Sequence, residues 1–426
     1  MHHFVLKGDI CYSTENRGLQ TAEDAYLVSI DGKSAGVFAE LPERYQDLRL
    51  IDCSGQLILP GLVDLHVHAP QFSFRALGMD LELIDWLNTY TFPEEARYGD
   101  LAYAKKAYET FIQHIRRGSN TRSVIFATRH VPGTVLLMDL LEESGLVTMV
   151  GKVNMDRHAP DPLRETDAET SLSDTRQWLR ETRDRYKRTE PILTPRFVPS
   201  CSDELMAGLG EIQREYGLPV QSHLSENRRE VSWVEELVPS AESYGHVYYK
   251  NGLFGGTVPT VMAHCVWPSV SEFDLMKQQK IWVAHCPQSN INLSSGIAPI
   301  RRYLDAGIPV GLGSDVAAGV HTSIFRSMVD AIGASKLYWR LVDQESAPLS
   351  LEEAFYLGTR GGGSFFGKVG SFEEGFEFDA LVIDDHTLGN VGERGIADRL
   401  ARVVYLFDER HIQRKFVQGR ELDLSK

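Results

Sequence analysis

The chain has 426 residues, 42% of them hydrophobic, and a formal net charge of −15 at pH 7. That length allows two or three domains or one large barrel, and that charge argues against nucleic acid as a partner because phosphates repel it. No apolar run approaches the roughly 20 residues that span a bilayer, so we expect no membrane partner. The first residues lack the pattern of a secretion signal, and the five cysteines are scattered. Both features favour a cytoplasmic location.

Short β-like runs, separated by turn residues, stand near both ends of the chain, at residues 4–6, 25–30, 36–38, 378–383, 402–406 and 416–420. Neither end is long enough to form a sheet with its own hydrophobic core. We therefore predict a small β-sandwich domain that combines residues 1–58 with residues 371–426. The intervening residues 59–370 would form a larger domain inserted between its two halves.

The central segment alternates apolar runs with helical patterns. Eight short runs of β-branched and small residues are candidate buried strands, near residues 59–65, 121–127, 146–151, 192–196, 218–222, 259–263, 280–285 and 308–314. Helical patterns lie between them, for example at residues 202–216 and 271–279. This alternation predicts an α/β fold, a (β/α)8 TIM-like barrel, in which the functional side chains follow the C-terminal ends of the strands.

Four of the predicted strands end in side chains that bind metals. His66 and His68 end the first strand, and their i, i+2 spacing turns both imidazoles to one face. The fifth, sixth and eighth strands end in His223, His264 and Asp315. The first pair alone is equally compatible with two structural histidines beside a turn. Repetition of the pattern at four strand ends favours a divalent metal such as zinc.

A second metal ion would need a bridging anion at the end of the fourth strand. That strand ends in Thr194-Pro195-Arg196-Phe197 and offers neither lysine nor cysteine, while Lys152 follows the third strand. We therefore expect one metal ion per chain.

Longer motifs surround these residues, at Pro60–Gln71, Asp85–Pro93, Gly151–Asp156, Thr194–Phe197, Gln221–Asn227, Ala284–Asn290 and Gly311–Gly319. Together they resemble the amidohydrolase superfamily over about residues 55–385. The sequences His-Ala-Pro-Gln, Trp-Leu-Asn-x-Tyr-Thr-Phe-Pro and Thr-Pro-Arg-Phe are similar to those of the guanine deaminases within it. The chain departs from that pattern at Arg122, at Val266-Trp267 and at Ser314, where a threonine is expected.

The resemblance implies a hydrolase that acts on the C–N bond of a cyclic amidine and converts guanine to xanthine and ammonia. One Zn²⁺ (zinc) ion per chain would be held by His66, His68, His223 and Asp315 and would activate a water molecule. Glu226, His264 and Asp315 would be the catalytic residues. Asp315 would accept a proton from the attacking water, and His264 would hydrogen-bond that water.

Glu226 lies three residues after His223. If a short helical turn follows the strand, both side chains point into one pocket. Burial disfavours the charged form of a carboxyl, so Glu226 could protonate N3 of the purine and shuttle protons. In isolation, the same glutamate is also compatible with a helix-start residue favoured by the helix dipole.

The resemblance assigns substrate contacts to His68, Gln71, Arg196, Phe197, His223, Glu226 and Asp315. Phe197 would supply an aromatic wall, and Arg196 would donate to the guanine O6. The Gln71 amide would both donate and accept along the O6/N1 edge. In isolation, Arg196 is compatible with a surface ion pair and Phe197 with a core position. The expected partners are this small molecule and a second copy of the chain in a homodimer.

Two other classes of function stay open. Another deaminase of the same superfamily, acting on a pterin, cytosine or triazine-like ring, would keep the ligands but change Gln71 and Arg196. A scaffold protein with this fold would lose ligands that this chain retains. His285-Cys286-Pro287 could be a further ligand cluster, although a supporting role beside the ligands is favoured. Structural roles are expected for His130, His158, Gly311, Gly313 and Gly319.

Overall fold

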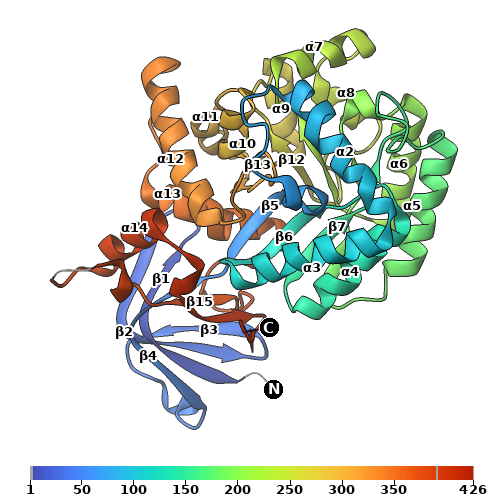
Figure 1. Ribbon diagram of the computed structural model, residues 1–426. Helices are drawn as coiled ribbons and strands as arrows, with labels where there is room; N and C mark the ends of the chain where they lie inside the picture. Colours follow the sequence, from blue (N-terminus) through green and yellow to red (C-terminus); the bar gives the residue numbers. More distant parts are fainter. Residues whose placement is uncertain (1–2, 390–391, 426) are drawn as a thin grey trace.

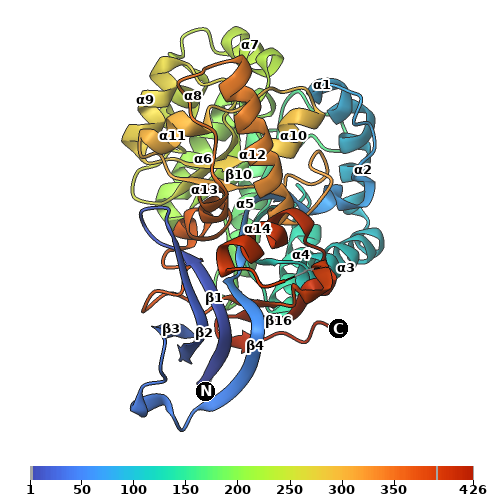
Figure 2. The same ribbon diagram turned by 90° about the vertical axis from the view of Figure 1, so that its left-hand side faces the viewer.

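The two ends of the chain meet in one sheet that is separate from the barrel. The structure, a computed structural model, describes residues 3–389 and 392–425. Its seven-stranded end sheet has the order β17-β16-β15-β4-β1-β2-β3. The strands are β1 (Phe4–Ser13), β2 (Leu19–Ile30), β3 (Lys33–Phe38), β4 (Arg49–Pro60), β15 (Ala380–Ile383), β16 (Ile412–Val417) and β17 (Arg420–Glu421). The expected joining of both ends is confirmed, and Figures 1 and 2 show this sheet beside one side of the barrel.

Strand β4 joins the two halves of the end sheet. It pairs in parallel with β1 on one side and antiparallel with β15 on the other. Aromatic side chains from both ends form the core of this sheet, where the Phe4 ring centroid lies 5.2 Å from that of Phe378 and 5.1 Å from that of Phe416. Because these rings come from opposite ends of the chain, neither end buries its apolar surface without the other.

One predicted β-like segment, residues 402–406, is wrong. It forms the end of helix α14 (Ile396–Leu406). The buried residues of this helix are Ile396, Leu400, Val403 and Val404. They recur at intervals of three and four, the spacing of one face of a helix, whereas the short β-branched run taken alone resembles a strand.

Eight parallel strands form the barrel, as predicted. One four-stranded sheet contains β5 (Leu62–His68), β6 (Asn120–Phe126), β7 (Val147–Gly151) and β9 (Thr189–Pro191). The other contains β11 (Val220–Leu224), β12 (Thr260–His264), β13 (Trp282–His285) and β14 (Val310–Leu312). A bridge between Leu193 and Val220 joins the two sheets. The other edge is closed by backbone bonds from Asp315 N to His66 O (2.8 Å) and from His68 N to Val316 O (3.2 Å).

Helices connect the strands and surround the barrel (Figure 1). They are α3 (Leu101–Arg117), α4 (Val131–Ser144), α5 (Ala168–Thr182), α6 (Asp203–Tyr216), α7 (Arg228–Leu237), α8 (Tyr244–Lys250), α9 (Val270–Gln279), α10 (Pro287–Asn292), α11 (Ile300–Asp305), α12 (Ile324–Leu341) and α13 (Leu351–Tyr356). The helices predicted near residues 202–216 and 271–279 are confirmed as α6 and α9. Within residues 3–389 and 392–425, no helix is both long enough and apolar enough to cross a membrane.

Two short segments extend the strand ends on the side of the site. A small parallel pair, β8 (Val153–Asn154) and β10 (Thr194–Pro195), continues the chain after β7 and β9. Between β5 and β6 an inserted segment carries α1 (Leu83–Trp86) and α2 (Phe92–Glu95), with a π-helical turn between them. The proposed domain boundaries after residues 58 and 370 stay predictions, and residues 1, 2, 390, 391 and 426 of those domains lie outside the described residues.

Candidate active site

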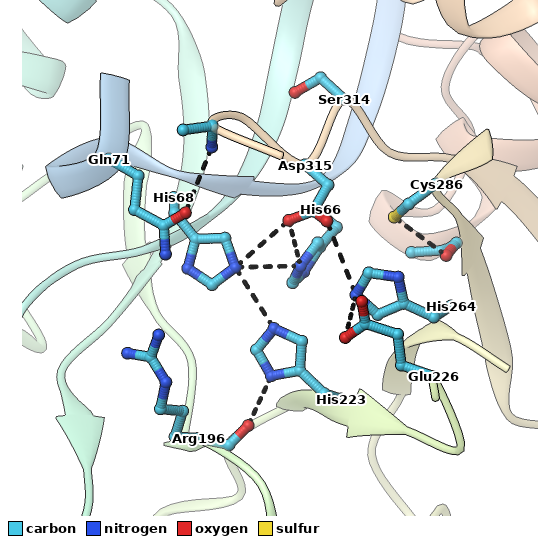
Figure 3. A network of polar contacts seen from close by, with 12 residues as sticks. His66, His68, Gln71, Arg196, His223, Glu226, His264, Cys286, Ser314 and Asp315 are labelled. Atoms are coloured by element: carbon cyan, nitrogen blue, oxygen red, sulfur yellow. Dashed lines mark hydrogen bonds and ion pairs between the residues drawn. The ribbon is translucent and has the colours of Figure 1, made fainter. Parts of the chain in front are cut away.

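Three imidazoles and one carboxylate converge at the C-terminal end of the barrel (Figure 3). The His68 Nε2 atom lies 3.2 Å from His66 Nε2 and 3.3 Å from His223 Nε2. The Asp315 Oδ1 atom lies 3.1 Å from His66 Nε2 and 3.4 Å from His68 Nε2. A tetrahedral zinc ion with bonds of about 2.0–2.1 Å would separate its ligand atoms by roughly 3.3 Å. The separations between His68 and each of the other three predicted ligands, and between His66 and Asp315, therefore suit a single small cation.

A bulge in β5 turns His66 and His68 toward this centre. Asp64 pairs with Ser123 and Val67 with Ile125, so three residue steps on β5 lie opposite two on β6. Before the bulge Leu65 belongs to the apolar cluster inside the barrel, and after it Val67 belongs to the core beneath the helices. The extra residue thus reverses which face each side chain takes. Strand alternation predicts that the two histidines share a face, but it does not predict the bulge.

The ligand histidines are held in the neutral form that binds a metal. The His223 Nδ1 atom lies 2.6 Å from the carbonyl oxygen of Arg196, which accepts a hydrogen bond from it and leaves Nε2 free to face the centre. Burial lowers the pKa of His68 to about 4 and that of His223 well below its usual range. Burial alone would raise the pKa of Asp315, but its contacts with His66 and His68 hold that pKa well below its usual range. The set therefore combines three neutral donors with one anion.

Asp64 connects the first and last strands behind the proposed ligands, a role that sequence patterns did not indicate. Its carboxylate accepts hydrogen bonds from Ser314 N (2.9 Å), Ser314 Oγ (2.6 Å) and His66 N (3.2 Å). Ser314 supplies the hydroxyl that a threonine would supply there, so this departure from the family pattern preserves the contact. Gly313 is also required, because a Cβ there would lie 2.9 Å from His66 Cβ. These contacts place Asp315 beside His66.

Glu226 and His264 lie on the other side of the ligand cluster from Gln71 and Arg196 (Figure 3). The Glu226 Oε2 atom is 3.4 Å from His264 Nε2, which is 3.7 Å from Asp315 Oδ2. The Asn290 Oδ1 atom lies 2.9 Å from His264 Nδ1 and fixes the ring. Burial, reinforced by the charge of neighbouring carboxylates, raises the pKa of Glu226 well above its usual value. Glu226 is thus suited to donate a proton at neutral pH.

The backbone at these strand ends is locally strained. Ser225, His264 and Asp315 have φ values of 47°, 72° and 46°, in the region that side chains other than glycine rarely adopt. On β12, Val261 and Ala263 face the barrel interior. Simple alternation would therefore turn His264 outward, and its positive φ redirects the ring into the site. The prediction of a helical turn between His223 and Glu226 is wrong. The left-handed backbone conformation of Ser225 reverses the chain direction there instead.

Two further buried carboxylates, missed by sequence reasoning, hold the turn that carries Glu226. The Glu230 Oε2 atom accepts the backbone N–H of Glu226 at 2.9 Å, and Tyr244 donates its hydroxyl to Oε1 at 2.7 Å. The Glu272 carboxylate accepts the Ser225 hydroxyl at 2.7 Å. Glu230 completes the capping box of α7, which was the only signal of its role in the sequence.

A loop after α10 completes the surroundings of Glu226. Ser295 donates its hydroxyl to Glu226 Oε1 at 3.1 Å. The Trp267 indole N–H donates to the Ser295 carbonyl oxygen at 2.7 Å and fixes that loop. Trp267 was one of the departures from the family pattern, and this contact gives it a structural reason.

A pocket above the ligands contains every predicted substrate-binding residue. Its polar lining consists of His68, Gln71, Arg196, His223, Glu226, His264 and Asp315. Its apolar lining consists of Leu83, Trp86, Leu87, Phe197, Leu293 and Ala318. Apart from Phe197, no role was predicted for these apolar residues, although Trp86 and Leu87 lie within the Asp85–Pro93 motif and Ala318 within the Gly311–Gly319 motif. A flat ring with polar edges fits such a lining.

The other sequence candidates lie outside this lining. Lys152 forms a buried ion pair with Glu165. His285 is turned away from the barrel interior, since its neighbours Ala284 and Cys286 belong to the interior cluster. The Cys286 sulfur lies within 4.8 Å of ligand atoms of His66, His264 and Asp315, but it donates to the Ala284 carbonyl oxygen at 3.4 Å. These contacts match a supporting role better than a ligand role.

Arg122, another departure from the family pattern, joins the barrel to the end sheet. Its Nε atom donates to Asp379 Oδ2 at 2.6 Å, and both side chains are buried. His158 Nδ1 lies 2.8 Å from the Pro199 carbonyl oxygen, and the His130 ring packs against Gly99. None of these three residues contributes to the pocket.

Comparison with known proteins agrees with this geometry. The amidohydrolase family model matches residues 57–422. Guanine deaminase of Dictyostelium discoideum is 35% identical over 98% of both sequences, and that of Homo sapiens is 34% identical over 98% of this chain and 96% of the human protein. The crystal structure of guanine deaminase from C. acetobutylicum with bound guanine has a TM-score of 0.96 and 46% identity, covering 99% of this chain and 100% of that one. The chain therefore belongs to the amidohydrolase family and, within it, to the guanine deaminases.

Proposed function

We propose that this protein hydrolyses guanine to xanthine and ammonia with one zinc ion per chain. One observation carries the proposal: three of the four proposed metal ligands line a single pocket, with a buried acid on one side of them and paired N–H donors on the other. In guanine, N3 and the N1/O6 edge flank C2, the carbon that loses its amino group. The two sides of the pocket therefore match the two sides of that carbon.

Zinc suits the donors at this site. His66, His68, His223 and Asp315 would hold it through three nitrogens and one oxygen, whereas magnesium and calcium prefer oxygen ligands. When bound, zinc would polarise a water molecule and lower its pKa toward 7.

The chain's own residues would then move the protons. Asp315, with Oδ2 facing His264, would accept a proton from the water as its oxygen bonds to C2. His264 would hydrogen-bond that oxygen, and Glu226 would protonate N3, which takes up the electron pair of the opened C2–N3 double bond. The exocyclic amine would then receive a proton through Asp315 and leave as ammonia when the C2–N bond breaks. Glu226 would then accept the proton of the C2 hydroxyl as the C2 carbonyl forms, which restores the acid and leaves the N3 proton on xanthine.

The remaining predicted contacts would place the base. Phe197 and the apolar lining would hold its faces, and Arg196 and Gln71 would donate to O6. A pocket built to bond polar ring atoms rejects analogues that lack them, because its own buried groups would be left unpaired.

A panel of substrates tests this proposal, with ammonia release as the readout. We expect turnover of guanine and none of adenine, which has no amino group at C2. Turnover of a pterin, cytosine or a triazine without turnover of guanine would contradict the proposal and support the alternative deaminase.

A homodimer and a cytoplasmic location are also part of the proposal. Leu337, Leu341 and Val342 at the end of α12 are 51%, 75% and 63% exposed and offer an apolar surface to a second copy. All five cysteines are buried and free, which suits a reducing compartment. Light scattering should give twice the mass of one chain, and a monomer at micromolar concentration would contradict the dimer.

A further inference from the structure

Glu95 is a buried carboxylate at the back of the pocket, and it has no role in the reaction described above. It ends α2 in the segment inserted between β5 and β6 and is only 3% exposed. Three N–H groups converge on it. Arg196 Nη1 donates to Oε2 at 2.6 Å and Nη2 to Oε1 at 3.2 Å, and Gln71 Nε2 donates to Oε1 at 2.8 Å. One carboxylate thus contacts both residues expected at the O6 edge.

Glu95 fixes the direction of the Gln71 amide. An ionised carboxylate only accepts hydrogen bonds, so the amide nitrogen must face it. On the other side of the amide, the Ala317 N–H donates to Gln71 Oε1 at 3.2 Å. Flipping the amide would place oxygen against the carboxylate and nitrogen against an N–H group. The amide nitrogen therefore keeps one N–H for the pocket, and the amide oxygen already accepts one hydrogen bond.

Glu95 also orients the Arg196 guanidinium. The two bonds use two of its five N–H groups and hold the plane from one edge. The Phe92 ring centroid lies 5.2 Å from the guanidinium carbon and restricts it further. Because Arg196 is 4% exposed, its charge needs this partner in order to stay in the pocket wall.

We propose that Glu95 is a positioning residue that makes Gln71 and Arg196 a pair of donors and so selects a ring that carries a carbonyl oxygen at this edge. In Figure 3 the Gln71 amide nitrogen points toward the Arg196 side chain, on the side of the ligand cluster away from Glu226. A carbonyl oxygen accepts from both groups, whereas an amino group in its place would meet only donors. This inference rests on the proposed function and adds the residue that sets its selectivity.

The test compares Glu95→Gln with Glu94→Gln, using guanine and 2-aminopurine as substrates. Both bases carry the amino group at C2, but only guanine has O6. Glu94 is a matched control on the same helix, since its contacts are to Ser73, Arg97 and Tyr103, outside the pocket lining. Ammonia release gives kcat and KM for each base, and elemental analysis gives the metal content.

In Glu95→Gln we expect the guanine kcat/KM to fall about 10- to 100-fold, mainly through KM, because buried donors lose their orientation and partner. The 2-aminopurine kcat/KM should change less than about 3-fold, since this base makes no O6 contact. The preference for guanine should therefore fall at least about 3-fold, with the metal retained. Glu94→Gln should keep the wild-type preference.

Equal losses for both bases in Glu95→Gln, or the same loss of preference in Glu94→Gln, would overturn the inference. If Glu95→Gln does not fold, Glu95→Asp provides the test. It keeps the carboxylate charge, but its side chain is one methylene shorter and places that charge farther from Gln71 and Arg196. A fall in preference of about 3-fold or more then supports the role, and an unchanged preference overturns it. Failure of the wild-type enzyme to release ammonia from guanine would instead contradict the proposed function.

Discussion

The two halves of the pocket are built in different ways. The proposed metal ligands stand at or just beyond the C-terminal ends of barrel strands, whose positions the sequence predicts. The wall that faces the O6 edge comes from non-strand segments, with Gln71 and Glu95 from the segment after β5 and Arg196 from the residue after β10. The first half can be deduced from strand periodicity. The second depends on contacts between distant segments, and each of its side chains is held by another side chain or by a loop backbone.

Metal removal should reduce activity the most, because the proposed metal ligands at the strand ends would then have no ion to bind. Chelation should abolish ammonia release, and added zinc should restore it. It should also lower the melting temperature, since a ligand present at 100 times its Kd stabilises by about 2.7 kcal/mol. Elemental analysis should give one metal ion per chain before chelation. Two tightly held ions, or full turnover of the stripped protein, would contradict the single-metal site.

Glu226→Gln should give the next largest loss of activity, because it removes the proposed proton donor. Glu226 lies on the other side of the ligand cluster from Gln71 and Arg196. General acid–base catalysis contributes about 10²–10⁴ in rate, and Glu226 acts more than once. We expect kcat to fall by at least that factor, with fold and metal content unchanged. Glu236→Gln on the exposed side of α7 is the matched control. A variant that keeps a tenth of wild-type turnover would exclude the shuttle role.

Arg196→Ala should weaken guanine binding at the O6 edge and leave metal binding unchanged. The substitution removes two donors and leaves the buried Glu95 carboxylate without its ion pair, so guanine kcat/KM should fall about 10- to 100-fold. The His223 contact should persist, because it uses the backbone carbonyl of residue 196 and not the side chain. Metal content should therefore equal that of wild type, and a loss of metal would show that the two halves are not independent.

Glu272→Gln should change turnover least and pH dependence most. Burial raises the pKa of Glu272 to about 7, above the value near 4.5 that it has when unfolded. Its contribution to stability is thus fully present below pH 4.5 and is lost as the pH rises through 7. The difference between wild-type and variant unfolding free energies should therefore shrink over that window. Denaturant titrations at pH 5 and pH 8 measure it, and an equal difference at both would contradict the shifted pKa.

The sequence predicts the strand-end positions of the site better than the contacts between distant segments. Strand-end positions such as His223 and Asp315 follow from short apolar runs, so the barrel and its ligand cluster could be predicted. The bulge that aims His66 and the positive φ at Ser225 depend on close packing between neighbouring strands and carry no local pattern. Glu95 is the second of two adjacent glutamates after Pro93, and only the fold brings it, rather than Glu94, to Arg196.

The pairing of β4 with both β1 and β15 has a consequence for how the chain folds during synthesis. The ribosome makes residues 49–60 early, but their antiparallel partner, residues 380–383, emerges only after the entire barrel. Until then one edge of β4 is open, with its backbone groups unpaired and available to other chains. This part of the sheet therefore forms only after the whole barrel has been made, and aggregation during expression should depend on how quickly residues 380–383 dock on β4.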